Sequence, residues 1–207
     1  MRKPQIFECS EEATIKCALL VKNGGVVVFP TDTIYGIGCD PYNDSAVKRI
    51  FMIKGRDEKK PLPVLTYNSS AAQEIVLLGK VGRALAQRFW PGALTIVAPL
   101  TDRKISHGVV AGSSNLAVRV PANKCILMLL RHCKYLVGTS ANLSGEESLN
   151  SSKEVLDSRL QGYDAILDGG QTERGMESTI IEIGGKPKIL REGAIKSTEV
   201  LRLLDQI

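Results

Sequence analysis

The sequence of 207 residues is poor in residues that bind metals or anchor a chain in a membrane. It has two histidines, His107 and His132, and no Cys-x-x-Cys pair among its five cysteines. Because no Cys or His stands at ligand spacing from another, we expect no structural zinc site and no other protein-held metal. No apolar run reaches the length of a transmembrane helix, and the first residues are not those of a signal peptide.

The cysteines are odd in number and irregularly spaced: Cys9, Cys17, Cys39, Cys125 and Cys133. This pattern is typical of a reducing cytoplasm, where cysteine acts as a small apolar residue. Aromatic residues make up only 5% of the chain, which leaves no aromatic platform of the kind that binds single-stranded nucleic acid. We therefore expect a cytoplasmic protein with reduced thiols.

The net charge is +5 and the isoelectric point is about 9.0. This excess favours anionic partners such as nucleotides or RNA, but it equally fits a protein whose charge only aids solubility. The length favours one domain over residues 1–207, with two as the alternative. Apolar runs and helical periodicities interleave, with several strands in succession, so we expect an α/β fold with a twisted, open mixed sheet flanked by helices.

Four cations, Lys54, Arg56, Lys59 and Lys60, fall within seven residues that follow a predicted helix over residues 44–53. Arginine offers phosphate a planar fork and lysine a point charge, although a basic run alone is usually a solvated surface. The chain has neither a P-loop motif nor a Gly-x-Gly-x-x-Gly turn, so neither of those nucleotide folds applies.

Two further segments combine polar groups with buried strands. Residues 30–38 follow the apolar run 26–29, at the strand end where open α/β sheets bind ligands. Composition alone favours an ordinary turn there. Arg119 lies within an apolar strand and needs either a ligand or a structural ion pair. Residues 101–114 are largely polar and contain two glycines, and we expect either this loop or the C-terminal region near Arg191 to close over the site as a lid.

Several motifs in one order resemble a known family over nearly the whole chain, residues 11–195. They are Pro-Thr-Asp-Thr-Ile-Tyr-Gly-Ile-Gly, Lys-Gly-Arg with Lys-Pro-Leu, Phe-Trp-Pro-Gly-Ala-Leu-Thr, Val-Arg-Val-Pro, Thr-Ser-Ala-Asn-Leu-Ser-Gly, Glu-Ser-Thr-Ile and Leu-Arg-Glu-Gly-Ala-Ile. This series is similar to that of the YrdC-like L-threonylcarbamoyladenylate synthases. The resemblance implies a YrdC-like fold with a positively charged cavity. It also implies a nucleotidyltransferase that forms threonylcarbamoyl-AMP and pyrophosphate from L-threonine, bicarbonate or CO2, and ATP with Mg2+.

The resemblance also implies roles for individual residues. Lys54 and Arg56 are the implied catalytic cations, and the implied ATP-binding residues are Lys54, Arg56, Lys60, Asn115, Ser140, Asn142, Ser148 and Arg191. The implied threonine-binding residues are Thr33, Tyr35, Arg119, Thr139 and Ser178. The chain departs from the pattern at Leu65, where many relatives have histidine, and at Asn115, where threonine is common.

The implied product serves a transferase complex that modifies tRNA, to which this chain would hand its adenylate. Longer relatives carry a further C-terminal domain, and the short segment after Ile195 leads us to expect the single-domain type. One alternative is a non-catalytic module that binds tRNA or other double-stranded RNA through the basic cavity. Another is the related module of hydrogenase maturation proteins, but the zinc-finger and acylphosphatase segments that accompany it are absent from this sequence.

Overall fold

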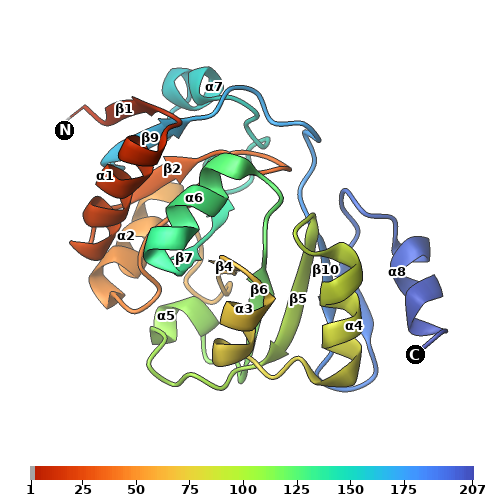
Figure 1. The fold of residues 1–207 in the computed structure, drawn as a ribbon. Coiled ribbons are helices and arrows are strands. Elements are labelled where there is room, and N and C mark those ends of the chain that lie inside the picture. Colours follow the sequence, from red (N-terminus) through yellow and green to blue (C-terminus); the bar gives the residue numbers. More distant parts are fainter. Residues whose placement is uncertain (1–2) are drawn as a thin grey trace.

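The computed structural model describes residues 3–207, and their strands form two mixed sheets flanked by helices (Figure 1). The expected α/β class is confirmed, but the strands divide between two sheets where one was expected. The five-stranded sheet has the order β1 (Gln5–Glu8), β9 (Ala165–Asp168), β2 (Val27–Phe29), β3 (Gly36–Gly38) and β8 (Thr139–Ser140). The six-stranded sheet has the order β11 (Lys188–Arg191), β10 (Thr179–Glu182), β5 (Leu94–Pro99), β6 (Asn115–Arg119), β4 (Val64–Thr66) and β7 (Tyr135–Val137).

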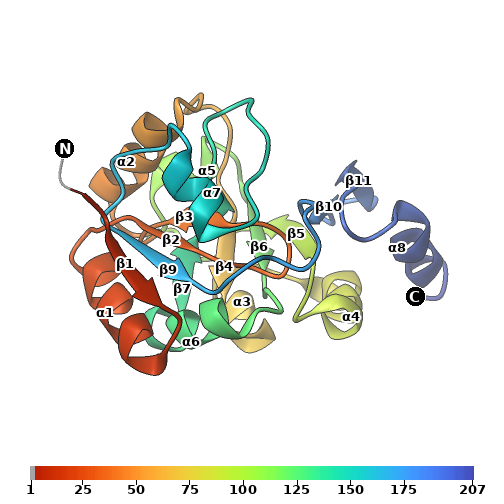
Figure 2. The ribbon, with the colours of Figure 1, turned by 90° about the horizontal axis from the view of Figure 1, so that it is seen from above.

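Helices cover both sides of the strands, with α1, α3 and α6 on one side and α2, α5 and α7 on the other (Figure 2). Among the described residues the helices are α1 (Glu11–Lys22), α2 (Asp44–Lys54), α3 (Ser69–Ile75), α4 (Gly79–Phe89), α5 (His107–Val110), α6 (Lys124–Cys133), α7 (Ser152–Asp157) and α8 (Ser197–Leu204). The predicted start of α1 is confirmed, because the Ser10 side chain accepts a hydrogen bond from the Ala13 N–H at 3.2 Å.

The two sheets meet where the chain leaves β7 and enters β8 after a single residue, Gly138. β3 lies close to this junction because its glycines lack side chains. A Cβ at Gly38 would fall 1.7 Å from the carbonyl oxygen of Val137, and one at Gly36 would fall 2.6 Å from the Phe29 ring. The Gly-Ile-Gly part of the first motif is therefore a packing requirement at the sheet junction.

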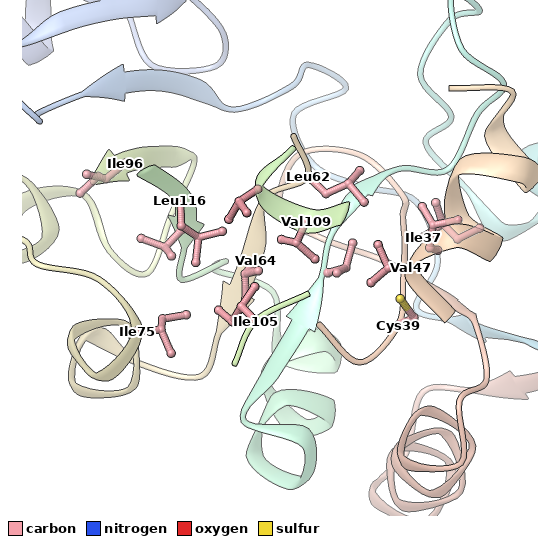
Figure 3. Packing of buried hydrophobic residues seen from close by; sticks show 14 of the residues in the cluster. Ile37, Cys39, Val47, Leu62, Val64, Ile75, Ile96, Ile105, Val109 and Leu116 are labelled. Carbon is pink, nitrogen blue, oxygen red and sulfur yellow. The ribbon is translucent and has the colours of Figure 1, made fainter. Parts of the chain in front are cut away.

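Residues 101–114 are anchored to the core, which contradicts their expected role as a mobile lid. They form the short helix α5, whose Val109 is fully buried and packs with Leu62 and Val47 in the main apolar cluster (Figure 3). The Leu62 N–H donates to the Val109 carbonyl at 2.8 Å, and the Ser106 N–H donates to the Pro41 carbonyl at 2.9 Å. Backbone bonds and burial thus fix this segment in place.

A disulfide joins Cys9, just before α1, to Cys125, in the first turn of α6. The expectation that every cysteine is a free apolar residue is therefore wrong for this pair. It holds for Cys17 and Cys39, which are free and buried, and burial raises the pKa of the Cys17 thiol to about 11. No helix in residues 3–207 has the length and apolar character needed to cross a membrane.

The Cys9–Cys125 bond closes a sequence separation of 116 residues, so it restricts the unfolded chain strongly. We predict that Cys125→Ser lowers the free energy of unfolding by about 2–4 kcal/mol under oxidising conditions. Urea unfolding with and without dithiothreitol measures this. Cys133→Ser, which removes a free thiol, should keep the dependence on reductant that Cys125→Ser loses, and equal behaviour of the two variants would contradict the assignment.

Candidate active site

A cavity of about 250 Å³ opens at the junction of the two sheets. Its apolar wall includes Phe29, Leu65 and Val97. Its polar lining comes from segments far apart in the sequence: Thr31, Thr33, Arg56, Thr95, Arg119, Thr139, Ser140, Glu177, Ser178 and Arg191. Three guanidinium groups and one carboxylate therefore face a space rich in hydroxyl groups. This is a chemical setting for an anionic ligand that also carries hydrogen-bonding groups.

Arg119 at the end of β6 is 5% exposed, and three fixed acceptors hold its guanidinium. Nη2 donates to Asp32 Oδ1 at 2.6 Å, Nη1 donates to Thr33 Oγ1 at 3.0 Å, and Nε donates to the Gly92 carbonyl at 2.8 Å. Burial lowers the pKa of Arg119, and the Asp32 carboxylate opposes that effect. Because each Nη atom carries two hydrogens, Arg119 keeps donors for a ligand carboxylate in the cavity that it lines.

Asp32 orients Arg119 and lies in the turn after β2, so this ion pair connects the two sheets. Its Oδ1 also accepts the Ala122 N–H at 2.9 Å. Within residues 3–207, Oδ2 is buried and has no hydrogen-bond partner. From the sequence, Asp32 was one of several polar groups in residues 30–38 that could bind a ligand or form an ordinary turn, and its pairing with Arg119 was not predicted.

Lys54 at the end of α2 is 2% exposed and binds the loop that follows β8. Its ammonium donates to the Ser140 carbonyl, to the Asn142 carbonyl at 2.7 Å and to Asn142 Oδ1 at 3.3 Å. The Asn142 amide in turn donates to the Glu146 carbonyl at 2.6 Å. Burial lowers the pKa of Lys54 to about 8, with a further contribution from Arg56 and an opposing one from Glu177. All three ammonium hydrogens thus have protein acceptors, so Lys54 shapes the loop that presents Ser140 to the cavity.

Arg56 lines the cavity from the loop that follows α2, and Arg191 lines it from the end of β11. Arg56 Nη2 donates to the Pro61 carbonyl at 3.0 Å, and burial lowers the pKa of Arg56. Arg191 forms an ion pair with Glu177, and its Nη2 donates to the Ser178 carbonyl at 2.9 Å. The Ser178 hydroxyl lies 2.8 Å from that of Thr95. Thr95 had no role in the sequence-based prediction, and Glu177 was predicted only as part of a turn or a ligand contact over residues 177–179.

The cavity brings together Thr33, Arg56, Arg119, Thr139, Ser140, Ser178 and Arg191 of the predicted site residues. The others lie outside it. The Tyr35 hydroxyl donates to the Gly170 carbonyl at 2.8 Å, and Asn115, at the other end of β6 from Arg119, donates to Glu182 at 3.1 Å. Lys60 is exposed and Ser148 is half-buried. The contacts of Tyr35 and Asn115 fix neighbouring strands and loops.

The fold and the cavity define an α/β protein with a pocket at the junction of its two sheets, lined by three guanidinium groups and one carboxylate. A family model for the Sua5/YciO/YrdC domain, described as telomere recombination, matches residues 19–193. The chain belongs to this family, as the sequence motifs indicated.

Two curated relatives are named threonylcarbamoyl-AMP synthase. The one from Pyrococcus abyssi is 35% identical over 208 residues, which are 98% of this chain and 60% of the relative. The one from Bacillus subtilis is 35% identical over 93% of this chain and 56% of the relative. This chain therefore spans little more than half the length of these two relatives.

A solved structure of Pyrococcus abyssi Sua5 in complex with L-threonine matches with a TM-score of 0.91 and 32% identity. The match covers 100% of this chain and 62% of that one. Escherichia coli YciO matches with a TM-score of 0.82 over 93% of this chain and 96% of its own, at 23% identity, which shows the shared fold.

The buried Asp32–Arg119 pair gives a testable stability prediction. Asp32→Asn leaves the Arg119 charge buried beside a neutral amide, so we expect the free energy of unfolding to fall by about 3–5 kcal/mol. Asp157→Asn is the matched control, because it breaks the exposed ion pair with Lys153 and should cost less than about 1 kcal/mol. Urea unfolding of both variants measures the difference. Equal small losses would show that the pair does not support the fold.

Proposed function

We propose that this chain makes threonylcarbamoyl-AMP and pyrophosphate from L-threonine, bicarbonate or CO2, and ATP, and so acts as a nucleotidyltransferase. The observation that carries the proposal is the cavity itself, where Arg56, Arg119 and Arg191 surround buried hydroxyl groups. The reaction joins two anions, a carbamate and an α-phosphate, so electrostatic repulsion is its main barrier. Fixed cations lower that barrier because they need no reorganisation when the anions meet.

Threonine would lie in the enclosed part of the cavity, with its carboxylate on Arg119. Thr33, Thr139 and Ser178 are the hydroxyl groups at hand for its own hydroxyl. A space of about 250 Å³ is smaller than the roughly 300–1,000 Å³ of sites for drug-sized ligands, so it suits an amino acid. The relative crystallised with L-threonine supports this assignment.

ATP would lie along the cationic rim, with its phosphates on Arg56 and Arg191 and with Ser140 as a hydroxyl donor. In this proposal Lys54 and Asn142 position the loop that carries Ser140, and Lys60 and Ser148 contact the nucleotide from outside the cavity. Mg2+ would arrive on the triphosphate, because it prefers substrate phosphates with few protein carboxylates. The cavity lining fits that mode, since its oxygen donors are hydroxyl groups and a single carboxylate. The ion would neutralise phosphate charge as pyrophosphate leaves.

The product would pass to a transferase complex that modifies tRNA. The chain would then act in the cytoplasm. In the same proposal, the cationic rim formed by Arg56 and Arg191 also contacts tRNA or other double-stranded RNA.

Pyrophosphate release from ATP tests the proposal directly. We expect release only when L-threonine and bicarbonate are both present, and we expect Arg56→Ala to lower kcat/KM by an amount equivalent to about 2–4 kcal/mol. The exposed Arg83→Ala is the control and should retain the wild-type rate. No release by the wild-type chain, together with RNA binding that weakens steeply with salt, would instead support the non-catalytic RNA-binding module.

Substrate choice gives a second prediction. Loss of the threonine hydroxyl leaves a buried polar partner unpaired, so L-2-aminobutyrate should bind more weakly by about 1–3 kcal/mol. Calorimetric titration of both amino acids into the same protein measures the gap. Equal affinities would show that no hydroxyl of the cavity recognises the side chain.

A further inference from the structure

Glu177 is the one carboxylate among the described residues that line the cavity, and the mechanism above gives it no task. It lies directly before Ser178, on the segment that enters β10. Its side chain is 34% exposed and is paired with Arg191. Burial lowers the pKa of Lys54 and of Arg56, and the charge of Glu177 opposes this effect at both, so Glu177 lies near these two cations.

The proposed reaction needs a proton acceptor. At neutral pH the amino group of threonine is an ammonium with a pKa of about 8 or above, and its nitrogen has no lone pair for attack. It must lose one proton before it can form the bond to CO2. A carboxylate beside the bound ammonium is suited both to holding it and to taking that proton.

The topology places Glu177 two strands away from Arg119 on the lining of the same cavity. Arg119 ends β6, Thr95 lies opposite it on β5, one step beyond the Ile96–Val118 pair, and Thr95 is aligned with Ile180 on β10. At about 4.8 Å per strand spacing, the end of β6 and the start of β10 are about 10 Å apart. The ammonium and the carboxylate of an amino acid are attached to the same carbon, so the long Arg119 and Glu177 side chains can reach these two groups of one ligand across this spacing.

We propose that, within the proposed function, Glu177 is the catalytic base for the threonine ammonium. One proton passes from the ammonium nitrogen to a Glu177 carboxylate oxygen, and the freed lone pair forms the N–C bond to CO2. One C–O π pair moves onto oxygen, and the second nitrogen proton leaves to water, which gives the carbamate. The carbamate oxygen then bonds to the α-phosphorus of ATP as the bond to pyrophosphate breaks.

Glu177 is paired with Arg191, so it becomes free to accept the threonine proton only after ATP binds. In the free protein the guanidinium of Arg191 forms an ion pair with the Glu177 carboxylate. A phosphate that binds Arg191 competes for the same donors and releases Glu177 towards the amino acid. Deprotonation of threonine therefore follows nucleotide binding.

The test is the pH profile of kcat/KM for threonine, measured by pyrophosphate release from pH 6.0 to 7.5, below the Lys54 pKa of about 8. We expect a flat wild-type profile in this range, because Lys54 stays charged and threonine stays a zwitterion whose proton Glu177 accepts. Glu177→Gln should be slower on the order of 10²-fold at pH 7. Its rate should then rise about tenfold per pH unit towards the amine pKa, since only the free amine can react. Glu173→Gln, an exposed neighbour on the same segment, should match the wild type.

A deficit in Glu177→Gln that is the same at every pH would overturn the proposal, because Glu177 would then only hold Arg191. A change confined to KM for ATP or to the Mg2+ requirement would overturn it as well. Glu177→Asp keeps a carboxylate and should keep the flat profile at a lower rate, which separates loss of the base from loss of folding. If the wild type releases no pyrophosphate with threonine, the proposed function fails first, whereas an active wild type with an unchanged Glu177→Gln profile removes only this inference.

Discussion

The structure depends on one buried ion pair, between Asp32 in the turn that follows β2 of one sheet and Arg119 at the end of β6 in the other. A guanidinium with 5% exposure is strongly disfavoured unless its charge and its hydrogens have partners. Asp32 supplies the charge, and Thr33 and Gly92 supply further acceptors. Because these partners come from the turn after β2 and the turn after α4, the contacts of Arg119 tie both turns to β6, and Arg119 still lines the cavity.

The other polar groups of the site are held in the same way, through contacts that fix them before any ligand arrives. Lys54 binds the backbone of Ser140 and Asn142, and Arg191 binds the backbone of Ser178. Lys54 is the last residue of α2, and Arg191 is the last residue of β11, a strand of the six-stranded sheet. Preorganised donors of this kind stabilise charge that develops in a reaction at little cost in reorganisation. Glu177 is the exception in the proposed mechanism, because there its partner Arg191 also binds phosphate.

Much of this fold could be predicted from the sequence wherever a local pattern decides the structure. Helix α1 follows its Ser10 cap, β5 follows a continuous apolar run, and α8 follows the amphipathic spacing of residues 197–204. The short strands β1, β3 and β8 were missed, because two to four residues carry no periodicity and their pairing depends on distant strands. The separation of the strands into two sheets could not be predicted for the same reason.

The motifs predicted which residues form the site, but they did not predict how those residues contact one another. The motifs identified Thr33, Arg119, Ser178 and Arg191, which the fold brings to one cavity. They could not show that the Lys54 ammonium donates to backbone carbonyls. The sequence of a basic run does not distinguish cations that face solvent from cations that contact protein or ligand. The Cys9–Cys125 pairing was equally hidden, since it depends on α1 and α6 packing side by side.

A structure of the chain with L-threonine and a non-hydrolysable ATP analogue would show whether the buried Asp32–Arg119 pair builds the site. We expect the threonine carboxylate on Arg119, with the Asp32–Arg119 pair intact, and the phosphates on Arg56 and Arg191. The threonine nitrogen should then face Glu177. Threonine bound away from Arg119, or an Arg119 side chain that leaves Asp32 to reach the ligand, would contradict the claim that this buried pair builds the site.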